Sequence, residues 1–85
     1  MIIKYKKHKM LKEIGENIRE SRKDINLSLV KVSELSGISR QTLSGIEKGI
    51  RSGKLMIQYL CFLKSKGVDL NELFSFSTLN KTVEK

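Results

Sequence analysis

The sequence predicts an all-α fold, a compact bundle of about five short helices. Apolar residues recur at intervals of three and four, which is the spacing of one helix face, and only Ile2 to Lys6 hints at strand-like alternation. Glycines suited to ending helices follow three of these segments, at Gly37, Gly49 and Gly67. The 85 residues fall below the typical domain size of about 100–150, so we expect a single domain.

The first helix is indicated by an apolar stripe spaced by three, four and seven residues, formed by Leu11, Ile14, Ile18 and Ile25. This stripe predicts about four turns that end near residues 24–26. Arg22 lies on the same face, which is an unusual position for a charge.

The second and third helices each begin after a serine that can accept a backbone hydrogen bond as N-cap. Ser28 precedes a helix over about 29–35, whose inner stripe is expected to be Leu29, Val32 and Leu35. Ser39 precedes a helix over 40–48. On that helix the inner side is expected to carry Ser39, Leu43, Ile46 and Ile50.

The fourth helix is predicted over about 54–66, and Asp69 is a suitable N-cap for a short last helix over 70–74. The residues of the fourth helix that we expect to be mostly buried are Leu55, Ile57, Leu60, Cys61 and Leu63. In this interpretation Cys61 is a core thiol.

Two segments flank the bundle, which divides the chain into 1–9, 10–74 and 75–85. The first is a basic arm that contains Lys4, Lys6, Lys7 and Lys9. It is either a solvated terminus or an arm that lies on phosphates. The polar tail carries Phe76, Leu79 and Val83 at helical spacing. It is either disordered or a short amphipathic segment that packs on a partner subunit.

The net charge of +8 favours a polyanionic partner. Five lysines between Lys4 and Lys12 supply more than half of that excess. A second basic cluster follows the third helix and consists of Lys48, Arg51 and Lys54.

Two short helices joined by a tight glycine turn, the second rich in polar side chains, form a helix-turn-helix at about 29–48. In order, the chain contains Ser-Gly-Ile-Ser at 36–39, Leu-Ser at 43–44, Ile-Glu-Lys-Gly at 46–49 and Leu-Phe at 73–74. With these motifs the sequence resembles the phage-repressor and Cro family, the xenobiotic-response-element-like class with a lambda-repressor-like fold, over about sixty residues.

The resemblance implies a double-stranded-DNA-binding transcription regulator, in the first instance a repressor that binds a palindromic operator as a homodimer. It would work in a bacterial or phage cytoplasm, associated with the nucleoid. The expected dimer surface runs from the end of the fourth helix through Phe74 and Phe76.

The third helix carries the residues expected to read bases, since one α-helix fits the major groove. Its polar face contains Arg40, Gln41, Ser44, Gly45 and Lys48. Arginine suits guanine and glutamine suits adenine, so we assign base readout to Arg40 and Gln41, with Ser44 beside them. Gly45 stands where the family often has a base-reading side chain. This glycine suggests either a close approach of the backbone there or a base step that is read by fewer contacts.

Further roles follow from the resemblance. It implies a partly buried ion pair between Arg22 and Glu47 that holds the third helix at its docking angle. The DNA backbone would be contacted from the ends of the second and third helices and from the following loop, by Ser28, Ser39, Thr42, Lys48, Arg51 and Lys54.

Other functions find little support in the sequence. His8 stands alone, so neither a metal site nor a catalytic triad can be assembled, and we expect no enzyme and no cofactor. No apolar run approaches the roughly 18 residues that cross a bilayer. Two alternatives remain: an antitoxin whose tail or last helices hold a toxin, and non-specific nucleic-acid binding driven by charge.

Overall fold

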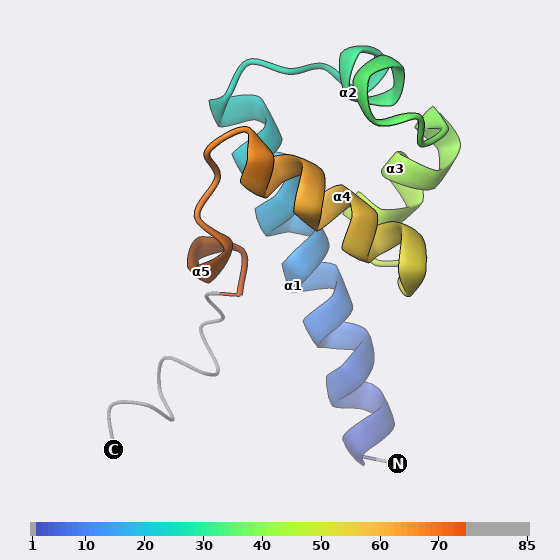
Figure 1. Ribbon diagram of the computed structural model, residues 1–85. Coiled ribbons are helices and arrows are strands. Elements are labelled where there is room, and N and C mark those ends of the chain that lie inside the picture. The colour runs from blue at the N-terminus through green and yellow to red at the C-terminus, as the bar shows by residue number, and fades with distance from the viewer. Residues whose placement is uncertain (1, 75–85) are drawn as a thin grey trace.

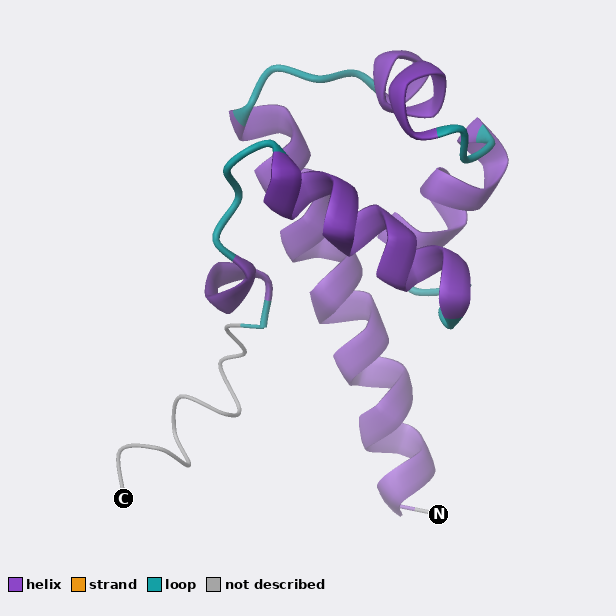
Figure 2. Ribbon diagram, in the orientation of Figure 1, coloured by secondary structure: helices purple, strands orange, loops and turns teal. Residues whose placement is uncertain are grey.

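The computed structural model describes residues 2–74, and the side chains of residues 9–74. Within them the fold is all-helical, in the order α1 (Ile2–Asp24), α2 (Leu29–Ser36), α3 (Arg40–Glu47), α4 (Lys54–Ser65) and α5 (Leu70–Leu73). The tail at 75–85, which includes Phe76, lies outside the described residues. The predicted fold class is therefore confirmed, and the loops between the helices are short (Figures 1 and 2).

The long helix α1 organises the bundle, because α3, α4 and α5 all pack against it while α2 packs on α3. Nine side chains form the core: Ile14, Ile18, Val32, Ile38, Leu43, Ile46, Tyr59, Leu63 and Leu73. Every one of the five helices contributes at least one of them. The first turns of α1 extend beyond the other helices (Figure 1).

Helix α1 begins well before the apolar stripe that predicted it. The boundary expected at residue 9 is not a boundary of secondary structure, because residues 2–9 form the first turns of the same helix. No Gly or Pro interrupts the chain before Gly15, and lysine is a good helix former.

The caps predicted from the sequence are present. The hydroxyl of Ser28 accepts a hydrogen bond from the amide of Lys31, and that of Ser39 accepts one from the amide of Thr42. The carboxylate of Asp69 accepts from Asn71 at the start of α5. Gly37 ends α2 with φ of 81°, in the left-handed region that favours glycine.

The predicted inner face of α4 is partly wrong. Tyr59 and Leu63 are buried with Met56 and Leu60 packed beside them, whereas Leu55, Ile57 and Cys61 are exposed. The helix carries two apolar stripes. Only one of them faces α1 and α3, and it consists of Met56, Tyr59, Leu60 and Leu63 at the spacing i, i+3, i+4, i+7.

Two other expected core positions are exposed. Leu35 lies at the edge of α2, beside an inner face that runs through Leu29 and Val32, and is 49% exposed. Ile50 is 75% exposed because α3 ends at Glu47 and Gly49 takes a φ of 78°, so Ile50 no longer follows the helical register.

Candidate nucleic-acid interface

Helix α3 lies very close to α1, and two glycines permit the contact, Gly15 within α1 and Gly49 just after α3. A Cβ on Gly15 would lie 2.6 Å from the carbonyl oxygen of Ile46 and still closer to that of Glu47. A Cβ on Gly49 would lie 2.7 Å from the Cα of Lys12. The end of α3 therefore rests directly on the backbone of α1.

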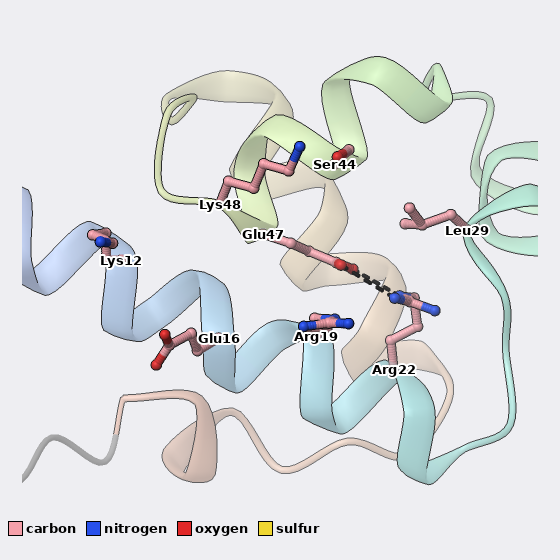
Figure 3. A pocket seen from close by; sticks show the side chains of 8 residues that line it. All are labelled: Lys12, Glu16, Arg19, Arg22, Leu29, Ser44, Glu47 and Lys48. Carbon is pink, nitrogen blue, oxygen red and sulfur yellow. Dashed lines mark hydrogen bonds and ion pairs between the residues drawn. The ribbon is translucent and has the colours of Figure 1, made fainter.

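A buried polar cluster joins α1, α3 and α4 at the same level. Arg22 Nε donates to Glu47 Oε2 at 2.7 Å, and Arg22 Nη2 donates to Oε1 at 3.2 Å (Figure 3). The Tyr59 hydroxyl donates to Glu47 Oε2 at 2.5 Å. Arg22 Nη1 also donates to the carbonyl of Leu27 in the loop before α2, at 2.8 Å. The structure thus brings the expected pair together and adds a third member.

The cluster changes how its members ionise. The hydrogen bond that Arg22 donates to Glu47 raises the pKa of Arg22, so the guanidinium keeps its charge although it is buried. Burial, and then the bond to Glu47, raises the pKa of Tyr59 above its usual value of 10.0. Glu47 therefore accepts hydrogen bonds from both Arg22 and Tyr59 on the inner side of α3.

Sequence reasoning missed Tyr59 as a member of this cluster. The available signal was a single hydroxyl among the apolar residues of α4, because a buried tyrosine usually finds a hydrogen-bond partner. Glu47 was already expected to turn inward, which makes it the natural acceptor.

The opposite side of α3 carries the predicted base-reading residues. Arg40 and Gln41 are exposed in its first turn, and Ser44 is half-buried one turn later. This turn is held in place because the Ser39 hydroxyl donates to Thr42 Oγ1 at 2.9 Å while accepting from the Thr42 amide. Arg40 and Gln41 therefore project from a capped helix terminus.

These side chains line a shallow groove of about 650 Å³. Its lining contains no carboxylate and consists of Leu29, Val30, Arg40, Gln41, Ser44, Gly45, Lys48, Ile50 and Arg51. A lining that combines three cations and two hydrogen-bonding side chains with apolar residues, and that contains no acidic residue, suits the base edges and phosphates of a DNA groove.

A second cleft of about 570 Å³ lies between α1 and α3 (Figure 3). Lys12, Glu16 and Arg19 line it from α1, and Ser44 of α3 and Lys48 at the end of that helix line its other side. The sequence reasoning did not assign Lys12 and Arg19 to the site, because only tertiary packing brings them beside the polar face of α3.

The other predicted contact residues are distributed around this surface. Ser28, Ser39, Lys48, Arg51 and Lys54 are exposed, and Thr42 is half-buried. Of the four lysines in the predicted arm, Lys9 is exposed, and the side chains of Lys4, Lys6 and Lys7 lie outside the described part of the chain.

Within the described residues no helix has the length and apolar character needed to span a membrane. Among the side chains of residues 9–74, no group of three or more His, Cys, Asp or Glu residues could hold a metal ion.

The fold and this surface define a helix-turn-helix protein. The family model described as helix-turn-helix matches residues 18–70, which is more than half of the chain. The chain belongs to this family, in its xenobiotic-response-element branch with lambda-repressor and Cro-like proteins. It is accordingly a DNA-binding transcription regulator of that type. No match was found among curated proteins or solved structures.

Proposed function

We propose that this regulator binds a palindromic operator as a homodimer and represses transcription by occupying the site. The observation that carries the proposal is the exposure of Arg40 and Gln41 on the capped first turn of α3. Bidentate contacts from these residues to guanine and adenine would provide sequence discrimination. Lys48 and Lys54, with Ser28, Ser39 and Thr42, would position the helix on phosphates.

The buried cluster supports this function by fixing the angle of α3. Glu47 faces inward, where Arg22 balances its charge and Tyr59 donates a hydrogen bond to it, so that α3 itself presents no free carboxylate to the phosphates. A buried pair contributes little net stability, but removal of one partner leaves a buried charge and costs about 3–5 kcal/mol.

Apolar side chains left exposed on α4 and directly after α5 support dimerisation, since Ile57 is 61% exposed and Phe74 is 42% exposed. A symmetric dimer would place two α3 helices in successive major grooves, about 34 Å apart. The proposed location is a bacterial or phage cytoplasm, where operator DNA lies in the nucleoid.

Selection of binding sites from random duplexes tests the proposal directly. We expect the full chain, at about 0.15 M salt, to enrich two inverted half-sites whose centres are about 10 base pairs or a multiple apart. A pool in which no motif emerges would contradict sequence-specific binding and support charge-driven association. Enrichment of a single half-site at all protein concentrations would contradict the homodimer.

A further inference from the structure

The side chain of Arg51 occupies the space that a side chain at position 45 would fill. A Cβ built on Gly45 would lie 2.9 Å from Arg51 Cδ, 3.0 Å from Cγ and 3.2 Å from Nε. Gly45 follows Gln41 by one turn, on the polar face of α3. Gly45 is nevertheless buried, so atoms of another residue cover this position. The stem of Arg51 therefore lies across the face of α3 to which base readout is assigned.

The backbone after α3 holds Arg51 in this place. The amides of Ile50 and Arg51 both donate to the carbonyl of Gly45, at 2.9 and 3.2 Å. Gly49 allows the reversal with its φ of 78°. The loop consequently folds back on the helix, and Arg51 returns to the groove that Arg40 and Gln41 line.

The guanidinium of Arg51 is available to a ligand. Among residues 9–74, no carboxylate forms an ion pair with it, and none lines the groove. A guanidinium presents a planar fork of donors that matches O6 and N7 of guanine in the major groove. Lysine has the same charge but cannot form this fork.

We propose that Arg51 is a third base-reading residue, which supplies over Gly45 the side chain that α3 itself lacks there. This inference rests on the proposed sequence-specific DNA binding. It differs from the phosphate contact that the sequence suggested for Arg51. It also explains why position 45 is a glycine, since a residue with a Cβ would displace the stem of Arg51. The glycine is retained in the helix although it costs about 1 kcal/mol relative to alanine.

The test compares binding of Arg51→Lys and Arg51→Ala variants to the selected operator, to operators with one altered base pair, and to random duplex. Wild-type protein should prefer G·C over other base pairs at one position, which lies beside the positions assigned to Arg40 and Gln41 and is read by Arg51. Both variants should lose that discrimination by roughly 5- to 150-fold. Arg51→Lys should keep most of its affinity for random duplex, because its charge remains.

Two further variants sharpen the test. Lys54→Ala removes an exposed cation from the first position of α4 and should weaken binding to operator and random duplex alike. Gly45→Ala should disturb preference at the base pair assigned to Arg51 when Arg51 is present, and should have no further effect in the Arg51→Ala background. Circular dichroism of each variant verifies that the helix content of the protein is unchanged.

The outcomes separate the inference from the proposal on which it rests. If the wild-type protein prefers a site and Arg51→Lys binds every altered operator with the wild-type pattern, Arg51 is a phosphate contact and the inference is wrong. The inference would also be wrong if Gly45→Ala and Arg51→Ala changed discrimination at that base pair additively. If the wild-type protein shows no preference for any duplex, the proposed function fails, and the inference fails with it.

Discussion

The hydroxyl of Tyr59 in α4 donates to Glu47 Oε2 of α3 at 2.5 Å, and the same oxygen accepts from Arg22 of α1. Three helices that are distant in sequence are thereby tied to one carboxylate, which lies on the inner side of the second helix of the helix-turn-helix. Because hydrogen bonds to charged groups are stronger than neutral ones, we expect this carboxylate to contribute strongly to the orientation of α3.

Replacing Tyr59 with phenylalanine should lower the free energy of unfolding by about 1.5–3 kcal/mol, because a hydrogen bond to a charged group is removed while the ring still packs. Urea denaturation measures this change. Gln58→Ala, an exposed position in the same helix, should stay within about 0.5 kcal/mol of wild type. Equal stability of Tyr59→Phe and wild type would show that the bond does not contribute.

The raised pKa of Tyr59 predicts a loss of stability in alkali. The folded protein holds the phenol neutral, whereas in the unfolded chain the phenol ionises near its usual pKa of 10. The contribution of Tyr59 to folding stability is therefore complete below pH 10 and declines as the pH rises above it. A Tyr5→Phe background leaves Tyr59 as the single phenol, since the chain has two tyrosines. Phenolate absorbance in that background should rise only together with unfolding followed by circular dichroism. Ionisation of the folded protein near pH 10 would contradict the prediction.

Gly15→Ala should destabilise the protein although alanine favours helices by about 1 kcal/mol. The added Cβ would collide with backbone carbonyls of Ile46 and Glu47, which cannot move without shifting the end of α3. We expect a net loss of roughly 1–3 kcal/mol in thermal or urea unfolding, together with weaker DNA binding. Glu20→Ala, at an exposed position of α1, serves as control and should be nearly neutral. A stabilised Gly15→Ala variant would contradict the close contact of α1 and α3.

Arg40→Ala and Gln41→Ala should each reduce discrimination at a defined base pair by about 1–3 kcal/mol. Affinity for the selected site should therefore fall much more than affinity for random duplex. Competition binding at fixed salt measures both. If the affinity of each variant falls by the same factor for the selected site and for random duplex, these residues contact phosphates and do not read bases.

Replacing Lys4, Lys6, Lys7 and Lys9 with glutamine tests the basic segment without introducing a helix breaker. If these lysines bind phosphates, binding should weaken on all duplexes. The slope of log affinity against log salt should decrease by about one for each phosphate that the variant no longer neutralises. The preferred site should stay the same. An unchanged salt slope would indicate that the segment is only solvated.

Much of the local structure was predictable because its causes are local. Ser28 and Ser39 cap helices through bonds to amides three residues away, and Gly37 adopts a conformation that it reaches at low cost. The polar face of α3 likewise follows from helical spacing alone. Errors appeared where two faces of one helix were both apolar, as in α4, since a periodic pattern does not say which face meets the core.

The sequence by itself therefore determined the helical fold, its caps and the helix-turn-helix that carries the proposed base-reading residues. The tertiary structure decided which partners distant side chains meet. Glu47 meets Tyr59 because α3 and α4 cross beside α1, and Arg51 lies over Gly45 because the loop after α3 turns back on the helix. Such contacts depend on packing between separate elements and on turn geometry, which no spacing within one helix encodes.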